Sequence, residues 1–539
     1  MKKLSLLFLA MVAAFALQAQ WTDNPAQNSI IAINDTTHHA TVGSVYTITD
    51  AVTNDTYVQW NSGFNGAGNG FSPTLQRLTS DGTPQWGESG IRFNQFDFLS
   101  WSAGDALTIT TDHDVVSCFS TADTVTVALR FHPDGTYAWG EQGVTLFGGN
   151  GGSRAEVIAG NDGGVWTLGS DNENLYLQYV NADGTLNPLI TLEPDNDTIQ
   201  YMYGKLVLRN DNSVFLTYEH VWVQPGSYSK WGTKEIHLTG YAVDGTQTIS
   251  DIVLMQKVDC VIPHCHSVEP DGLGGGYAYV SLAGDTTGNS FKVFALHYDA
   301  NGSNTISDPY GVTVHPEDSH HNYLVPGVSI DPVSHDLLVT YVQSTSFAYN
   351  PKLFVNRITA TGERVWDDGI LVIDSQSQLH EISSPNVSAF EDGNGFAVSY
   401  FYNITNADNG RYTVEAVGYD MNCNVLWNQQ LCSNDYAKTR PEKISGFHNG
   451  QNIIAWAYKN KNIIYAQNFG IDGKMGQGVV GIEEIFSDEE EIVNVVRIYN
   501  VNGQVVQCND LNELNIGVYI IQGTTESGKT INKKIVVAK

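Results

Sequence analysis

Residues 80–87 have the sequence SDGTPQWG, and residues 133–140 repeat it as PDGTYAWG. Six weaker copies of this turn follow, at Gly184, Gly245, Gly302, Gly362, near Asn422 and at Gly473. An Asp-Gly pair is a strong signal for a tight β-hairpin, because such a turn needs positive φ angles that glycine adopts at little steric cost. The sequence therefore predicts a series of eight hairpins of one kind.

The spacing of these turns decides the fold class. The first six turn glycines are separated by 53, 49, 61, 57 and 60 residues. An alternating strand-like run precedes each turn, for example residues 125–131, and a shorter one follows the better copies, for example residues 143–146. A repeat of about 50 residues with strand content is typical of a β-propeller or a repeat array.

We therefore expect an all-β, eight-bladed β-propeller over residues 20–478, with four strands in each blade. A seven-bladed ring with one irregular unit is the alternative. Trp21 and residues 29–33 look like the second half of a repeat, and the last repeat is weak after Gly473. We expect the N-terminal strand to complete the last blade, because a closed ring leaves no exposed sheet edges.

Tryptophan recurs just after the turn, at Trp86, Trp139, Trp366 and Trp427. Because these residues follow the repeat, packing between strands explains them better than ligand stacking does.

The chain of 539 residues has a formal net charge of −31. Such a surface repels phosphate backbones, so we expect no nucleic-acid partner. The carboxylates leave calcium binding open, although no D-x-D-x-D-G loop is present, and we expect no other cofactor.

The first 19 residues have the pattern of a secretory signal peptide. Lys2 and Lys3 precede an apolar run over residues 4–17, which is too short to favour a membrane span. We expect cleavage after Ala19, so that Gln20 begins the mature protein. No other stretch of the sequence is long and apolar enough to predict a transmembrane segment.

Residues 479–539 form a separate region. Residues 495–506, 514–521 and 533–539 resemble the C-terminal sorting domain of the type IX secretion system of Bacteroidetes. The residues that carry the resemblance are Tyr499, Gly503, Gly517, Tyr519, Lys533 and Lys534. The resemblance implies a small β-sandwich, contact with the secretion machinery, and export through the periplasm to the medium or the outer cell surface. The alternative is a small β-domain that only caps the propeller.

Cysteine and histidine gather in two loops one repeat apart. The candidate metal ligands are Cys260, His264, Cys265 and His266 in the first loop, and His315, His320 and His321 in the second. Thiolate and imidazole suit zinc or copper. A local disulfide between Cys260 and Cys265 is an alternative, and Cys423 could reach Cys432 only through a bent loop.

No catalytic motif of the G-x-S-x-G or H-E-x-x-H type is present. Asp112, His113 and Asp114 fall at a predicted turn, where short polar residues are common. We therefore expect a non-enzymatic module, secreted or on the cell surface, that binds a protein or glycan ligand. One alternative is a glycan-active hydrolase or lyase with its site in the propeller funnel, which two or three convergent carboxylates or a carboxylate–histidine–tyrosine group there would favour. Another is an envelope scaffold.

Overall fold

The computed structural model describes most of the chain. The described residues are 21–33, 38–64, 71–96, 106–122, 125–148, 155–171, 173–222, 232–260, 266–283, 291–315, 327–343, 351–375, 382–403, 411–434, 436–439, 441–458, 463–476, 492–500, 506, 517–525 and 530–537. Over these ranges the secondary structure consists of strands, with no helix. A helix long and apolar enough to cross a membrane is therefore absent from the described part of the chain.

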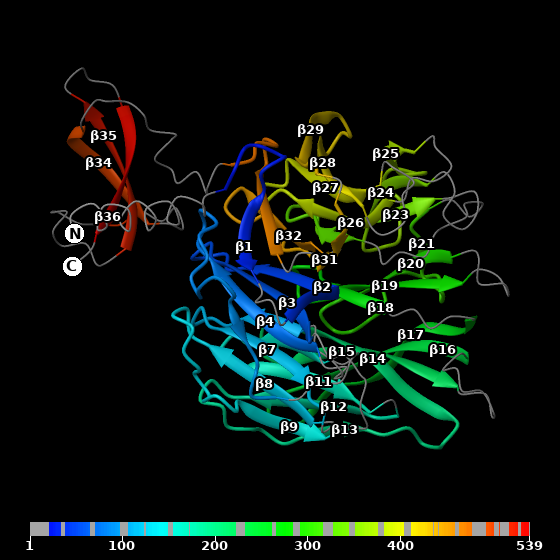
Figure 1. Cartoon of the computed structure of the whole chain (residues 1–539). Coiled ribbons are helices and arrows are strands. Elements are labelled where there is room, and N and C mark those ends of the chain that lie inside the picture. The colour runs from blue at the N-terminus through cyan, green and yellow to red at the C-terminus, as the bar shows by residue number, and fades with distance from the viewer. Residues whose placement is uncertain are drawn as a thin grey trace. The chain divides into compact units, whose positions relative to one another are not determined.

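The chain divides into two compact units, Met1–Gly478 and Val479–Lys539. In the first unit, eight mainly antiparallel sheets are arranged in a ring (Figure 1). The protein is an all-β, eight-bladed β-propeller, which confirms the predicted fold and excludes the seven-bladed alternative.

The first four blades follow one another along the chain. Blade 1 contains β2 (His38–Thr49), β3 (Thr56–Phe64), β4 (Phe71–Leu78) and β5 (Ile91–Arg92); blade 2 contains β6 (Ala106–Ile109), β7 (Val115–Ser120), β8 (Val125–Phe131) and β9 (Val144–Gly148); blade 3 contains β10 (Glu156–Ala159), β11 (Val165–Ser170), β12 (Leu175–Val180) and β13 (Ile190–Leu192); blade 4 contains β14 (Ile199–Leu208), β15 (Val214–Trp222), β16 (Gly232–Tyr241) and β17 (Gln247–Cys260).

The last four blades continue this order until the ring closes. Blade 5 contains β18 (His266–Pro270), β19 (Gly276–Ala283), β20 (Phe291–Tyr298) and β21 (Val312–Thr313); blade 6 contains β22 (Val328–Ile330), β23 (Leu337–Gln343), β24 (Lys352–Ile358) and β25 (Ile370–Asp374); blade 7 contains β26 (Ile382–Ala389), β27 (Gly395–Tyr402), β28 (Thr413–Asp420) and β29 (Val425–Cys432); blade 8 contains β30 (Lys438–Thr439), β32 (Gln451–Tyr458), β33 (Ile463–Gly470) and β1 (Ser29–Ile33).

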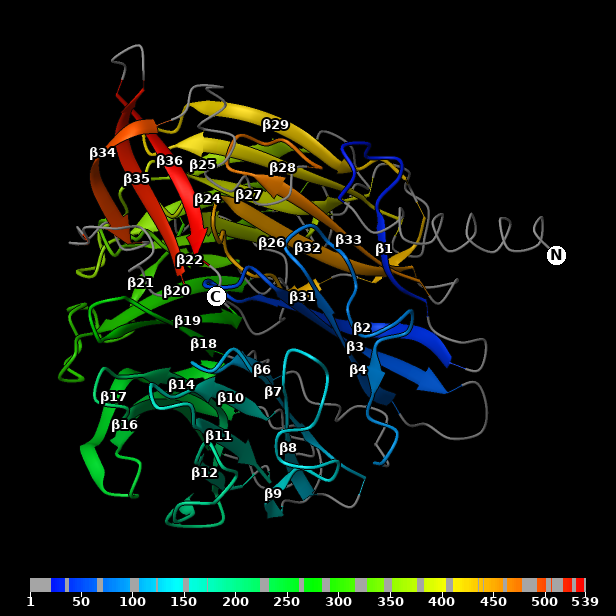
Figure 2. The ribbon, with the colours of Figure 1, turned by 90° about the vertical axis from the view of Figure 1, so that its left-hand side faces the viewer.

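The N-terminal strand β1 forms the outer edge of blade 8. It pairs antiparallel with β33, with Ser29 opposite Ala466 and Ile33 opposite Ile463. At the inner side of the same junction, β31 (Pro441–Lys443) pairs in parallel with β2 of blade 1. The two ends of the repeat region therefore meet in one sheet, and chain segments about 400 residues apart hold the ring closed (Figure 2).

Burial follows the order of strands within a blade. The first strands of neighbouring blades, such as β10 and β14 or β22 and β26, lie against one another around the ring. The second strand β7 is buried at every position and others such as β27 at all but the last, whereas the outer strand β29 alternates between exposed and partly buried residues over most of its length. This difference explains why the second strands have continuous apolar sequences and the outer strands do not.

The repeated tryptophans connect one blade to the next. The indole N–H of Trp86 donates to the carbonyl of Pro133, that of Trp139 to Ala182, and that of Trp427 to Ile471. In each case the acceptor lies in the Asp-Gly turn of the following blade. The indole N–H of Trp21 donates to Ser80 in the same way, from blade 8 to blade 1, at 2.8 Å. The tryptophans thus pack between neighbouring blades, and Trp21 makes the equivalent contact between blade 8 and blade 1.

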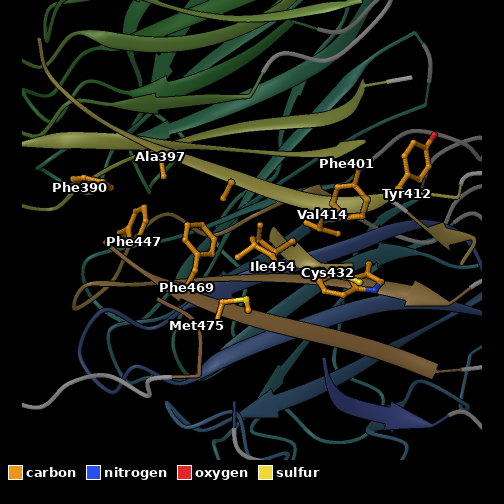
Figure 3. Close-up of a cluster of buried hydrophobic side chains, with 13 residues drawn as sticks. Phe390, Ala397, Phe401, Tyr412, Val414, Cys432, Phe447, Ile454, Phe469 and Met475 are labelled. Atoms are coloured by element: carbon orange, nitrogen blue, oxygen red, sulfur yellow. The ribbon is translucent and has the colours of Figure 1, made fainter. Parts of the chain in front are cut away.

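Apolar side chains fill the spaces between blades. Between blades 7 and 8, Phe401 and Phe469 pack with Trp456 and Phe390 in one buried cluster (Figure 3). Truncating a buried Phe or Trp to Ala typically costs about 3–5 kcal/mol. Of the cysteines whose side chains the structure describes, Cys118, Cys423 and Cys432 are free thiols, so Cys423 and Cys432 do not form a disulfide with each other.

The second unit contains β34 (Ile492–Asn500), β35 (Gly517–Thr525) and β36 (Thr530–Val537) in one antiparallel sheet. Tyr519 lies opposite Asn500, the neighbour of Tyr499, and Lys533 and Lys534 lie opposite Ile521 and Ile520. Gly517 begins β35, whereas Gly503 is outside the described residues. A second sheet of the expected sandwich would have to come from residues outside the described ranges.

Candidate functional site

A group of polar and aromatic side chains gathers on one face of blade 4. Across its strands, Tyr201 lies opposite His220, Tyr218 opposite His237, and His220 opposite Glu235. Because side chains alternate along a strand, these residues all project from the same face of the sheet. Tyr201 and Tyr218 pack in the apolar cluster shared with blade 3, so this face is turned toward blade 3.

A continuous chain of hydrogen bonds runs through the group. The Tyr218 hydroxyl donates to Asp251 Oδ1 at 2.9 Å, and Asp251 Oδ2 lies 2.8 Å from His237 Nδ1. On the other side of the imidazole, His237 Nε2 lies 3.0 Å from Glu235 Oε2. His237 is buried, while the Asp251 side chain is 47% exposed, so solvent reaches the group from the outer strand β17.

His220 lies beside this chain without joining it. Its ring is 4.9 Å from that of His237 and stacks on Trp222 at 4.3 Å. Both ring nitrogens are shielded from solvent, and neither has a hydrogen-bond partner within the described part of the chain. Lys257 lies over the Trp222 ring at 3.9 Å. An imidazole with two unsatisfied buried nitrogens is unusual, because burial without a partner costs free energy.

The two histidines have opposite pKa shifts. Burial lowers the pKa of His220, and the neighbouring His237 lowers it further. Burial would also lower the pKa of His237, but the carboxylates of Asp251 and Glu235 outweigh it and raise the pKa above the usual value. Interacting groups whose pKa values are pushed apart are characteristic of reactive sites.

The same residues offer a set of metal ligands. One ligand atom from each of His220, Glu235 and His237 lies within 4.8 Å of the other two. No other group of three such residues is found among the described residues.

A buried ion pair lies on the opposite face of the same hairpin. Lys234 Nζ contacts Glu219 Oε2 at 2.7 Å, and the two side chains are 1% and 0% exposed. Burial would raise the pKa of Glu219, but Lys234 and His266 lower it to about 2. The backbone N–H of His266 in blade 5 donates to Glu219 Oε1 at 3.1 Å. The pair holds β15 and β16 together and joins them to blade 5.

The histidines predicted from the sequence lie elsewhere. His266 is fully buried and bonded to Thr217 at 2.9 Å, and His315 is fully buried and accepts from the N–H of Val293 at 3.2 Å. Neither belongs to a three-ligand group of the described residues. The side chains of Cys260, His264, Cys265, His320 and His321 lie outside the described residues, so the metal prediction there remains a prediction.

Asp112, His113 and Asp114 have structural partners. Arg130 binds both Asp112 and Asp114, as Arg77 binds Asp55 in blade 1. His113 Nδ1 lies 2.7 Å from Asp50 Oδ2, at the edge of a pocket of about 470 Å³ lined by blades 1, 2 and 3. The equivalent turn of blade 6 uses His335 in the same way, toward the Asp271 carbonyl of blade 5. This repetition identifies the histidine as a link between blades.

The sequence analysis did not identify the blade 4 group. The signals present were the alternations Tyr218-x-His220 and Glu235-x-His237, which place each pair on one side of a strand. Asp251, His237 and Tyr218 form a carboxylate–histidine–tyrosine group, one of the arrangements that would favour the enzyme alternative if it lay in the central funnel. It spans the second to fourth strands of blade 4, whereas the expectation was the central funnel.

Comparison with known proteins gives information on the fold alone. No family model matches the chain, and no curated protein matches it. Among solved structures, a polysaccharide lyase described as an ulvan lyase matches 70% of this chain and 93% of its own, at 10% identity and a TM-score of 0.41. An endo-arabinase from Bacteroides thetaiotaomicron matches 50% and 95%, at 12% identity and a TM-score of 0.29. Prolyl oligopeptidase B from Galerina marginata matches 81% and 56%, at 10% identity and a TM-score of 0.41. Likeness at these levels carries no argument about activity.

Proposed function

We propose that this protein is an exported β-propeller that cleaves an extracellular glycan, and that the polar face of blade 4 is its reactive centre. The observation that supports this most is the chain Tyr218–Asp251–His237–Glu235 beside the imidazole of His220, which has no hydrogen-bond partner among the described residues. A carboxylate that fixes an imidazole, next to a second imidazole with free nitrogens, is an arrangement suited to reactive chemistry rather than to packing.

The roles follow from contact and exposure. His220 and His237 are the groups placed at the reacting atoms, and Glu235 lies with them. Asp251 is a positioning residue, because its carboxylate orients the His237 ring, and Tyr218 in turn fixes Asp251. Tyr218 is 3% exposed and burial raises its pKa, so its hydroxyl keeps its proton and donates to Asp251.

The substrate class follows from the proposed location and the charge. Outside the cell a polymer substrate is a glycan or a protein, and the glycan is the class that we propose to test first. A net charge of −31 disfavours a polyanionic substrate. We therefore propose neutral glycans, rather than those rich in uronic acids, as the substrates. We propose hydrolysis, rather than elimination, as the reaction.

The test is an activity screen of the mature chain on neutral and uronic polysaccharides. New reducing ends report hydrolysis, and new unsaturated sugar ends report elimination. We expect His237→Ala and Asp251→Asn to lower the rate by about 10²- to 10⁴-fold, the usual contribution of imidazole catalysis. His132→Ala is the matched control, because His132 is 49% exposed and its ring contacts Asp114 of blade 2, away from the blade 4 group.

Two results would contradict catalysis. Turnover that is unchanged in His237→Ala would move the reaction away from blade 4. Glycan binding by calorimetry without any product would support instead a binding module, with the blade 4 residues as its ligand contacts.

Export has its own support and its own test. The support is the signal-like start and the three C-terminal strands that carry the sorting pattern. The intact mass of protein from native culture should show a species that begins at Gln20 and ends near residue 480. A mature species that reaches Lys539 would argue against the sorting role and for an envelope scaffold.

A further inference from the structure

We propose that His220, Glu235 and His237 of blade 4 bind a divalent transition-metal ion, with zinc as the best fit. The inference deepens the proposed function at the same site, but it does not depend on the identity of the substrate. It starts from His220, whose two buried ring nitrogens have no hydrogen-bond partner in the described part of the chain, while the ligand atoms of Glu235 and His237 lie close by.

The distances suit a metal after a small adjustment. The three ligand atoms lie within 4.8 Å of one another. Zinc bonds of about 2.1 Å in a tetrahedral site place neighbouring ligands about 3.4 Å apart. Each side chain would therefore move by less than about 1 Å, which rotation of the Glu235 and His220 side chains can supply.

The surroundings of His237 match those of a metal-bound histidine. Such a ligand usually donates its second ring N–H to a carboxylate, which fixes the ring and makes the other nitrogen a better ligand. His237 Nδ1 lies 2.8 Å from Asp251 Oδ2, and the Tyr218 hydroxyl fixes Asp251 in turn. This leaves Nε2 to face Glu235 at 3.0 Å, with the His220 ring 4.9 Å from that of His237, and a bound ion would take the place of the Nε2–Glu235 hydrogen bond.

The ligands stand on a rigid support. His220 and Glu235 lie opposite each other on β15 and β16, and His237 follows Glu235 two residues later on the same face. The buried Glu219–Lys234 pair lies directly behind them, on the other face of the same two strands. A site carried by fixed strands is more precise than one carried by loops.

The type of ion follows from the ligands. Two imidazole nitrogens and one carboxylate suit zinc, whereas calcium takes oxygen ligands only, so this site is not a calcium site. Three protein ligands leave a fourth position open, which is the form that catalytic zinc sites take. A water molecule in that position would attack the anomeric carbon as the glycosidic C–O bond breaks; the water would lose a proton to solvent, and the leaving sugar oxygen would gain one from solvent.

The experiment measures zinc binding by calorimetry to the full-length mature protein, after dialysis against a chelator and with no glycan present. Cobalt substitution adds a visible absorption spectrum that reports nitrogen ligation. We expect one ion per chain. His220→Ala and Glu235→Gln should abolish it, and Asp251→Asn should weaken it by about 10- to 100-fold, the usual effect of losing the partner of a metal-bound histidine.

The controls separate this site from others. His132→Ala should bind zinc as tightly as the parent, and unchanged thermal unfolding of each variant shows that the fold is retained. Binding that survives His220→Ala but disappears in Cys265→Ser would place the ion in the cysteine–histidine loop and overturn the inference. The absence of binding in the parent protein would also overturn it. Zinc binding without glycan cleavage would support the metal site and refute the proposed function alone.

Discussion

The contact between Trp21 and Gly82 gives a quantitative test of how the ring closes. Gly82 has a φ of 84°, and a Cβ built there would lie 2.7 Å from Trp21 Cδ2 and 2.8 Å from Trp21 Cε2. Gly82→Ala therefore meets two costs. The left-handed backbone costs a non-glycine residue roughly 1–2 kcal/mol. The collision with the indole, which is 5% exposed, adds about 1–3 kcal/mol as overpacking.

Gly87→Ala is the matched control in the same blade. Gly87 has a φ of 77°, and nothing lies within 4 Å of a Cβ added there. Only the backbone cost applies, so the free energies of unfolding of the two variants should differ by about 1–3 kcal/mol. For a body of this size, that difference corresponds to roughly 1–3 °C in Tm.

The assay is unfolding by denaturant and by heat of both variants, alone and combined with Trp21→Ala. In the Trp21→Ala background, Gly82→Ala should lower the free energy of unfolding by no more than Gly87→Ala does. The coupling energy between residues 21 and 82 is then about 1–3 kcal/mol. Equal losses for Gly82→Ala and Gly87→Ala in the parent protein would refute the argument that Trp21 closes the ring through this turn.

Three further predictions concern charged groups. Lys234→Met should lower the free energy of unfolding by about 3–5 kcal/mol because it leaves the buried Glu219 carboxylate without its lysine, whereas the double variant with Glu219→Gln should recover most of the loss in the same denaturant assay. The pKa of Asp50 is held below its usual 3.8 because hydrogen bonds from two backbone N–H groups and His113 outweigh burial, so its stabilisation is present above pH 3.8 and is lost as the pH falls through the lower folded value. The Tm of Asp50→Asn should therefore fall less than that of the parent protein between about pH 5 and about pH 3. An equal fall in the two proteins would contradict this prediction. Burial raises the pKa of Glu269, so its charge destabilises the folded protein above that pKa; Glu269→Gln should raise the Tm near neutral pH, and the gain should vanish as the pH falls toward 4.5.

Much of the fold could be predicted from the sequence because its signals are local. The turn around Gly82 recurs with the spacing of a blade, and the buried second strands have continuous apolar runs such as β7. Trp21 carries the repeat's tryptophan without a repeat before it, which was enough to expect that the N-terminal strand joins the last blade. Each signal depends on residues that are neighbours along the chain, and backbone geometry turns them into one kind of unit.

The blade 4 site depended on tertiary structure, because its members meet only through strand register. His220 and Glu235 are separated by a connection whose length does not fix which residues become opposite. The pairing of β16 with β17 contains several bulges, and each one shifts the alternation of side chains. The spacing of residues in the sequence therefore could not predict that Asp251 contacts His237. The sequence determined that blades of one repeated kind form, whereas the tertiary structure decided between eight and seven blades, and packing and register decided which polar residues share a face.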